Sequence, residues 1–464
     1  MATTPTTEPG HHRISFRGLL RAAALLLSGD VVVQVTNILG SVVLTRGFGV
    51  AGFGVYALIN TTAGMTRRFL GFRTNEAVQR SLVAYSAPRD RQVVILAAMG
   101  ADLLVNIASL IVVAILAPVV ATSFGGGAGY LPAYYLCAAT GLLGVMNAPF
   151  FTVARMAERF RLLAVVAALG SVGSLLVSFI LLLLGQLTVW NYMVVLAIRA
   201  AIELTYKATH VTLYCRHELG FNLWRFSPWQ VLRAQRQISA FWKLMATGYW
   251  EESLTGLNQA AESYMLGYFG STAVVGFYRL AGHAADAVWM ISKIMSNVVF
   301  MDLTQAAKSG RVGAIYAMLD DVRRTWRWIL VGLAVVTMPL VYPAVLLLYG
   351  REFLGAVVPT VILLAGVYVA SYWFWGRPLL LALGQLRRFS RIVLFVMIFA
   401  LPVKFAATAY GGGIIPLAIA SSLTWFALHF SWATASRRTL RTQFGPPGAA
   451  ETAELAPAPA AADS

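Results

Sequence analysis

Long apolar segments follow one another along the whole chain, and they limit its folding more than any other feature. A helix that crosses a bilayer needs about 20 mostly apolar residues. Backbone polar groups inside a bilayer must bond within their own segment, so each segment is expected to be an α-helix. We place twelve spans in the 464 residues, at 19–45, 51–71, 92–119, 131–153, 162–184, 189–213, 240–267, 272–299, 327–349, 355–383, 390–410 and 412–435.

The composition agrees with this placement. Hydrophobic residues make up 58% of the chain and charged residues only 12%, and the mean hydropathy is +0.70. A water-soluble domain of this length carries about twice the share of charged residues. The sequence therefore predicts an all-α, multi-pass protein of the cell (inner or plasma) membrane.

The formal charge of +17 first suggests a nucleic-acid partner, but the positions of the basic residues argue otherwise. They gather in every second connection between the spans, whereas the other connections hold only Arg46 and Arg351. Basic residues concentrate on the cytoplasmic side of membrane proteins. Both termini are therefore expected to be cytoplasmic, and the expected partner of the basic residues is anionic membrane lipid, with no nucleic acid.

A polar helix face occurs twice in the sequence. Its polar residues are spaced by four, three and four positions in both copies. The first copy consists of Asp30, Gln34, Asn37 and Ser41, and the second of Glu251, Thr255, Asn258 and Glu262. Intervals of three and four residues place such side chains on one face of a helix. Beyond each copy, Gly54 and Tyr56 correspond to Gly276 and Tyr278. The chain is therefore expected to contain two copies of one membrane unit.

The duplication and the long basic connection in mid-chain set the expected domain boundaries. We expect two six-helix bundles, residues 18–214 and 240–436, joined by a basic cytoplasmic linker, residues 215–239. A disordered N-terminal tail is expected at 1–17, and a basic and then disordered C-terminal tail at 437–464, since these compositions do not support a core.

Ionisable residues inside the predicted spans are the main candidates for function. A single charged side chain at the bilayer centre costs roughly 3 kcal/mol on insertion scales. Such residues are therefore expected to face the bundle interior, pair with one another or line water. Structural pairing remains an alternative for Arg199 with Glu203, and for Asp286 with Lys293 or Arg279. Cys137 and Cys215 lie in different spans without a metal-binding spacing, so no disulfide, metal or cofactor is expected.

The two repeated stretches resemble the oligosaccharide (O-antigen and polysaccharide) flippases of the multidrug/oligosaccharidyl-lipid/polysaccharide exporter superfamily. In the first stretch the resemblance is carried by Leu44-Thr45-Arg46-Gly47 and Phe53-Gly54-Val55-Tyr56-Ala57-Leu58. In the second it is carried by Glu262, Leu266-Gly267-Tyr268-Phe269-Gly270 and Val275-Gly276-Phe277-Tyr278. Two residues depart from the family pattern, because Glu262 replaces the usual Asp and Arg279 stands where a small apolar residue is common.

The resemblance implies two bundles that face each other across a central cavity and rock between inward-open and outward-open states. The implied activity is the flipping of undecaprenyl-pyrophosphate-linked oligosaccharide to the outer leaflet, for polysaccharide or lipopolysaccharide biosynthesis. The implied partners are the lipid-linked substrate, an H⁺ or Na⁺ coupling ion and polysaccharide polymerase machinery.

For such a substrate, cationic side chains would replace the lost hydration of the diphosphate, and amides would contact sugars. The head-group candidates are Arg279 and Lys293, with Arg46 and Arg377 as gate or secondary anchors, and the amides Gln34, Asn37, Asn258 and Gln259. The candidates for proton or ion coupling are Asp30, Glu251, Glu262 and Asp286, since burial raises the proton affinity of a carboxylate.

Two other functions remain as alternatives. The first is an ion-coupled multidrug antiporter of the same superfamily, for which fewer cavity cations are expected. The second is a polytopic membrane glycosyltransferase or polymerase, which usually needs carboxylates or histidines at an outer face. Because the outer connections hold only one acidic residue, Glu352, and no histidine, we expect the protein not to be an enzyme.

Overall fold

The computed structural model describes residues 16–71, 74, 77–78, 81–82, 85, 87–157, 159–225, 241–242, 249–309 and 312–445. Within these residues the ordered elements are all helices, which agrees with the all-α prediction. Residues 1–15 and 446–464, and most of the predicted linker, lie outside the described part of the chain. The helix α16 continues to Phe444, beyond the predicted end of the second bundle at 436.

The described part of the first predicted bundle contains six α-helices and two short 3₁₀ turns. They are α1 (Phe16–Leu70), α3 (Pro88–Ser123), η1 (Ala128–Tyr130), α4 (Leu131–Thr140), η2 (Gly141–Gly144), α5 (Asn147–Met156), α6 (Phe160–Leu183) and α7 (Val189–His217). The predicted span 131–153 is thus made of α4 and α5 with η2 between them.

The second predicted bundle has a similar make-up. Its elements are α10 (Tyr249–Phe269), α11 (Thr272–Lys308), α12 (Val312–Ala344), η3 (Val345–Tyr349), η4 (Arg351–Ala356), α13 (Val357–Ser371), α14 (Gly376–Ala382), α15 (Leu386–Tyr410) and α16 (Ile414–Phe444). The segment η3 is a π-helical turn that extends α12.

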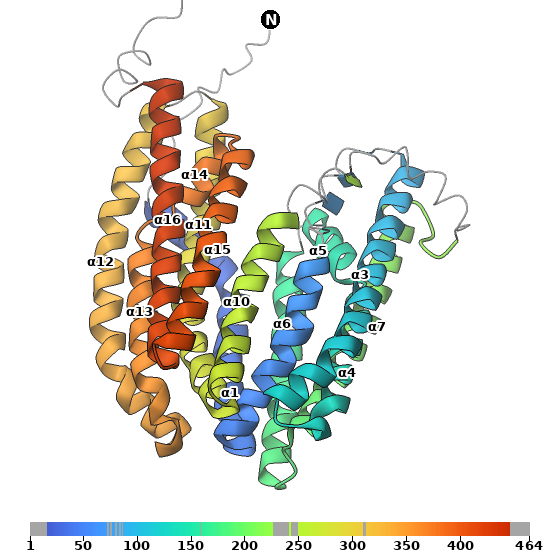
Figure 1. Cartoon of the computed structure of the whole chain (residues 1–464). Helices are drawn as coiled ribbons and strands as arrows, with labels where there is room; N and C mark the ends of the chain where they lie inside the picture. Colours follow the sequence, from blue (N-terminus) through green and yellow to red (C-terminus); the bar gives the residue numbers. More distant parts are fainter. Residues whose placement is uncertain are drawn as a thin grey trace, which may run out of the picture.

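The helix α1 contains both of the first two predicted spans, separated by a sharp bend at Gly49. This residue has φ 67° and ψ −177°, a backbone conformation that essentially only glycine adopts. Figure 1 shows the two arms of α1, before and after Gly49, meeting at the lower end of the molecule. The bend at Gly49 therefore folds α1 into a tight helical hairpin that joins the first two predicted spans.

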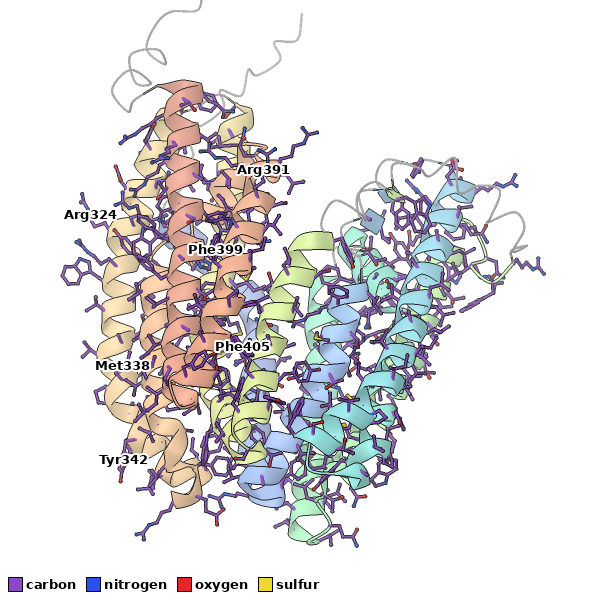
Figure 2. All side chains as sticks on the ribbon, viewed as in Figure 1. Arg324, Met338, Tyr342, Arg391, Phe399 and Phe405 are labelled. Carbon is purple, nitrogen blue, oxygen red and sulfur yellow. The ribbon has the colours of Figure 1, made fainter. Side chains whose placement is uncertain are left out.

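The helices form two groups that spread apart toward one end of the molecule (Figure 1). The first group holds α3 to α7 and the second group holds α11 to α16, while α1 and α10 run through the middle. Figure 2 shows Arg324 and Arg391 near the end where α16 finishes, and Tyr342 near the opposite end. Two basic residues from separate predicted inner connections thus lie toward the same end of the molecule, as the charge alternation predicts.

The largest hydrophobic cluster joins α1 to the second group of helices. Phe53, Ala57 and Leu58 of α1 are almost completely buried, together with Leu266 of α10 and Ala281 of α11. A second cluster connects the second arm of α1 to α3, α4 and α7. The helix α1 is therefore the element that holds the two groups together.

In the described residues, nine helical segments are long and apolar enough to cross a membrane. The two arms of α1 count as one segment among them, and α7 and α10, which carry several ionisable residues, are not included. The chain is a multi-pass membrane protein. The number of twelve spans and the orientation of the termini stay predictions.

Candidate functional site

A polar cavity of about 290 Å³ lies between the two groups of helices. Its walls come from both arms of α1, from α6 and α7, and from α11. The polar side chains that line it are Gln34, Thr36, Asn37, Ser41, Tyr56, Ser171, Ser174, Ser178, Tyr192, Arg199, Arg279, His283 and Asp286. Hydroxyl and amide groups thus surround two arginines and one carboxylate.

The α11 wall presents Arg279, His283 and Asp286, whose spacing of four and three residues places them on one helix face. The His283 ring meets Phe53 of α1 edge to face, with 6.2 Å between ring centroids. Arg279 also lines a smaller cavity of about 110 Å³ between α1, α10 and α11. This arginine therefore lies where the two cavities approach each other.

The smaller cavity contains a second arginine, Arg68 of α1. Its guanidinium Nη1 donates a hydrogen bond of 2.6 Å to Oε1 of Gln259 on α10. Gly256 of α10 packs on the Arg68 side chain, and a Cβ at this position would lie 3.0 Å from the Arg68 Cβ. The absence of a side chain at Gly256 therefore lets α10 approach Arg68 closely.

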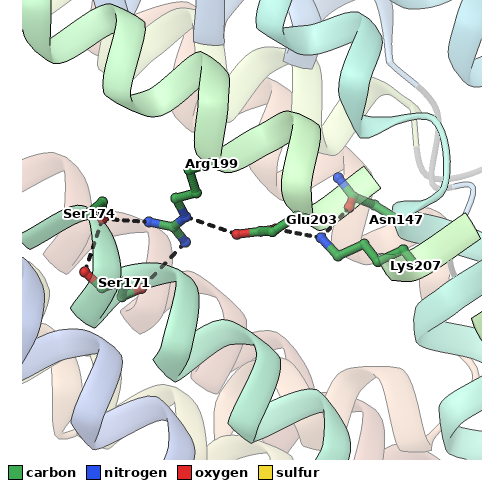
Figure 3. A network of polar contacts seen from close by, with 6 residues as sticks. All are labelled: Asn147, Ser171, Ser174, Arg199, Glu203 and Lys207. Carbon is green, nitrogen blue, oxygen red and sulfur yellow. Dashed lines mark hydrogen bonds and ion pairs between the residues drawn. The ribbon is translucent and has the colours of Figure 1, made fainter. Parts of the chain in front are cut away.

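The α7 wall is organised around Arg199, as Figure 3 shows. Its Nε donates to Oε1 of Glu203 at 2.8 Å, while its terminal nitrogens donate to Ser174 at 3.2 Å and Ser171 at 3.4 Å. On the other side, Lys207 Nζ donates to Oε2 of Glu203 at 2.6 Å. Lys207 also donates to Asn147 of α5 at 2.8 Å.

This network confirms the pairing of Arg199 with Glu203, and it also places Arg199 at the cavity wall. The side chain as a whole is 30% exposed. Five N–H donors are available on an arginine side chain. Three of them serve Glu203 and the two serines, which leaves two for a ligand in the cavity.

A separate ionic cluster lies in the interior of the second group of helices. Lys404 of α15, fully buried, donates to Glu262 Oε1 and, at 3.1 Å, to Asn258 Oδ1. Ser421 donates to the same carboxylate at 2.8 Å, and Tyr278 lies 2.9 Å from its second oxygen. Glu262 is thus fully engaged with protein groups.

Another polar contact joins α1 to the second group near the bend. Arg46 donates to the carbonyl oxygens of Leu347 and Leu348 at 3.4 Å each. Ser41 and the hydroxyl of Tyr349 are 2.8 Å apart. These contacts connect the end of the first arm of α1 with the π-helical turn η3. They lie at the end of the molecule that the charge pattern predicts to be the outer one.

The structure brings together only some of the residues predicted for the site. Gln34, Asn37, Arg279 and Asp286 line the larger cavity, and Gln259 lines the smaller one. Asn258 and Glu262 belong to the Lys404 cluster instead. Asp30 and Glu251 lie in α1 and α10, but their side chains are outside the described part of the structure.

Three predicted cations are not among the residues that line the two cavities. Arg46 lies at the outer contact, Lys293 is an exposed residue further along α11, and Arg377 lies over the ring of Phe389 at 5.6 Å. In contrast, Arg68 and Arg199 line the cavities, although neither was predicted as a head-group contact. Their sequence context gave only weak signals, since Arg68 ends a span and Arg199 has an acidic residue four positions later.

Comparison with known proteins finds matches in three-dimensional structure but none in sequence. No protein-family model matches the chain, and no curated protein sequence matches it. Several solved structures match it over most of its length. A multidrug resistance MATE family transporter of the MOP superfamily, in an inward-facing conformation, superposes with a TM-score of 0.71 at 12% identity, over 88% of this chain and 95% of that chain.

Two further structures show the same likeness. The lipid II flippase MurJ, in an inward closed conformation, gives a TM-score of 0.70 at 12% identity, over 93% of this chain and 90% of that chain. The Vibrio cholerae MATE transporter VcmN, in the bent form, gives a TM-score of 0.57 at 16% identity, over 92% of this chain and 97% of that chain.

The structure therefore defines a class: a multi-pass helical membrane protein with the fold shared by MATE transporters and the MurJ flippase. At these identities the likeness concerns the fold alone. The substrate has to be argued from the cavity.

Proposed function

We propose that this protein flips undecaprenyl-pyrophosphate-linked oligosaccharide from the inner to the outer leaflet of the cell membrane, by alternating access. The proposal assigns it to polysaccharide biosynthesis and gives it no catalytic step. The transporters among its structural neighbours support a role in transport, and one of them is a flippase of a lipid-linked substrate.

The observation that carries the proposal is the pair of arginines in the cavity. Arg199 comes from α7 and Arg279 from α11, so each of the two helix groups contributes one cation to the same cavity. A diphosphate loses hydration when it enters a low-dielectric membrane, and arginine replaces that hydration with directed, charge-assisted hydrogen bonds. The surrounding hydroxyls and the amides of Gln34 and Asn37 are suited to sugar hydroxyls.

The volume of the cavity adds a constraint on what enters it. At about 290 Å³ it lies at the lower end of the roughly 300–1,000 Å³ that small-molecule sites usually have. This volume suits the diphosphate and the sugar next to it. The rest of an oligosaccharide would fit only when the two groups of helices are further apart. The isoprenoid tail remains in the lipid.

The test is a reconstituted flipping assay. Purified protein in vesicles receives the sugar-lipid without a soluble sugar donor, and a membrane-impermeant reagent measures the lipid in each leaflet. We expect unchanged lipid to reach the opposite leaflet, with the rate reduced at least about tenfold in Arg279→Ala, as for the loss of a charge-assisted contact. Arg324→Ala, which changes an exposed arginine of α12, is the control.

Full flipping by a folded Arg279→Ala variant would contradict the site assignment. Formation or cleavage of a covalent bond in the sugar-lipid would favour a membrane glycosyltransferase or polymerase instead.

The second candidate is an ion-coupled multidrug antiporter. Two observations favour it: the MATE transporter superposes as well as MurJ does, and the carboxylate of Asp286 lines the cavity beside the arginines. An antiporter of this kind would export cationic dyes in response to a proton or Na⁺ gradient, and Asp286→Asn would abolish that export. Dye export that survives in Arg279→Ala and is lost in Asp286→Asn would select the antiporter.

A further inference from the structure

The residues of the Lys404 cluster are not among those that line the two cavities, and neither proposed transport activity uses them. It is formed by α10 together with α11, α15 and α16 of the second group. Lys404 and Ser421 have no exposed surface, Asn258 is 3% exposed, and Glu262 and Tyr278 are each 7% exposed. The cluster is therefore a largely buried polar site between the helices.

The oxygen atoms that the Lys404 ammonium contacts both come from α10, which is far from α15 in the sequence. A carboxylate oxygen of Glu262 and the amide oxygen of Asn258 accept its protons directly. The same carboxylate also accepts from Ser421, and its other oxygen is 2.9 Å from the Tyr278 hydroxyl. The hydroxyls of Tyr278 and Ser421 are themselves 3.0 Å apart. The two hydroxyls and the Glu262 carboxylate therefore form a closed ring of polar contacts.

This arrangement has the chemistry of a site for a small monovalent cation. Carboxylate, amide and hydroxyl oxygens are the ligands that hard cations take in proteins. A buried carboxylate needs a cation nearby, because an unpaired charge in the interior is strongly unfavourable. Here the positive charge is a lysine ammonium, fixed to the chain by its alkyl stem.

We propose that Lys404 is the built-in occupant of a monovalent-cation site formed by Glu262, Asn258 and Ser421. Two consequences follow. The natural protein binds no Na⁺ at Glu262, because the ammonium fills the position, and removal of the lysine side chain makes the protein bind Na⁺ there. Glu262 is then not a coupling residue, and among the predicted coupling acids whose side chains the structure describes, Asp286 is the one that lines the cavity. The inference holds for either proposed transport activity.

The test uses the full-length purified protein in detergent or nanodiscs. Thermal unfolding is measured in NaCl, KCl and choline chloride at equal ionic strength. We expect the natural protein to unfold at the same temperature in all three salts. For Lys404→Ala we expect a lower midpoint in choline chloride that rises by about 3 °C or more in NaCl, since a ligand bound only to the folded state stabilises it. Binding of radioactive sodium to the variant measures the same site directly.

Two controls separate this site from a general salt effect. Lys207 also pairs with a glutamate, but that glutamate, Glu203, keeps Arg199 as a second partner. Lys207→Ala should therefore show no preference for Na⁺ over choline. The double variant Lys404→Ala with Glu262→Gln has neither the cation nor the carboxylate, so its Na⁺ response should disappear.

Several outcomes would overturn the proposal. One is a folded Lys404→Ala variant that neither binds sodium nor responds to it. Another is a Na⁺-specific stabilisation of the natural protein that Glu262→Gln removes. Where Lys404→Ala is not recovered folded, Lys404→Gln gives the same comparison. Where neither variant folds, the thermal unfolding of the natural protein and of Glu262→Gln is compared in NaCl and choline chloride. A Na⁺-specific stabilisation of the natural protein that is lost in Glu262→Gln then contradicts the proposal.

Discussion

At the scale of the residue, Arg199 shows how a charged side chain is held at the edge of a membrane cavity. Glu203 balances its charge, and Ser171 and Ser174 fix the plane of its guanidinium. Gly170 of α6 makes room for this arrangement, because a Cβ there would lie 2.6 Å from Glu203 Oε1 and 3.0 Å from Arg199 Nε. A methyl group at position 170 would therefore displace the ends of these two side chains in the network of Figure 3.

The role of Gly170 leads to a residue-level prediction. Gly170→Ala should lower the free energy of unfolding by about 1–3 kcal/mol, the usual cost of overpacking, because the methyl group displaces the Arg199–Glu203 pair. Gly173, on the same helix, has open space around its Cβ position. Gly173→Ala should therefore be neutral or stabilise by about 0.5–1 kcal/mol. Unfolding in mixed detergent micelles measures both variants, and equal behaviour of the two would contradict the packing argument.

At the scale of the element, α1 and α11 cross at two glycines that correspond to each other in the duplicated units. A Cβ at Gly54 would lie 1.7 Å from the carbonyl oxygen of Thr272, and a Cβ at Gly276 would lie 2.6 Å from that of Val50. Only glycine at both positions permits backbones this close. The repeated motif thus places the same residue of each copy at the contact between the copies.

This crossing predicts different effects for two glycines of α11. Gly276→Ala should force α1 and α11 apart, with a loss of about 1–3 kcal/mol in stability and a change in the cavity that Arg279 lines three residues later. Gly282→Ala is the matched control, since nothing lies within 4 Å of its Cβ position. Flipping assays and unfolding measurements on the two variants test this. Normal stability of Gly276→Ala would show that the two helices are not tightly constrained.

At the scale of the whole molecule, the two groups of helices share one large hydrophobic cluster and one cavity, and both involve α1. The outer contact of Arg46 with the carbonyl oxygens of η3 lies beyond the cavity along α1. The groups spread apart at the other end (Figure 1). Alternating access would therefore require the Arg46 contact to separate while the opposite ends approach.

The predicted orientation in the membrane is testable by cysteine labelling. Both natural cysteines are buried, Cys137 at 5% and Cys215 at 0% exposure, so their reaction with a membrane-impermeant maleimide should be slow. Arg324→Cys and Arg391→Cys should react only from the cytoplasmic side, and Arg351→Cys only from the other side. Reaction of all three from one side would refute the positive-inside assignment.

Some properties of this protein were determined by the sequence itself. The helical, membrane-spanning nature of the chain follows from the length and apolarity of each segment, which are local properties. The bend at Gly49 was also predictable, because four glycines within 47–54 favour a turn. The helix face with Arg279, His283 and Asp286 follows from spacing alone.

Other properties were decided only by the tertiary structure. Lys293 shares the face of Arg279 by spacing, yet its side chain is exposed and is not among the residues that line the two cavities. Asn37 and Asn258 are equivalent in the repeat, but Asn37 lines the cavity and Asn258 binds Lys404.

The physical reason is that the role of a polar side chain in a membrane depends on the group it contacts, and that group is often distant in the sequence. Glu262 and Lys404 are separated by 142 positions, and no local pattern connects them. Periodicity predicts the face on which a charge lies, whereas the packing of the helices decides whether that face meets a cavity or an opposite charge.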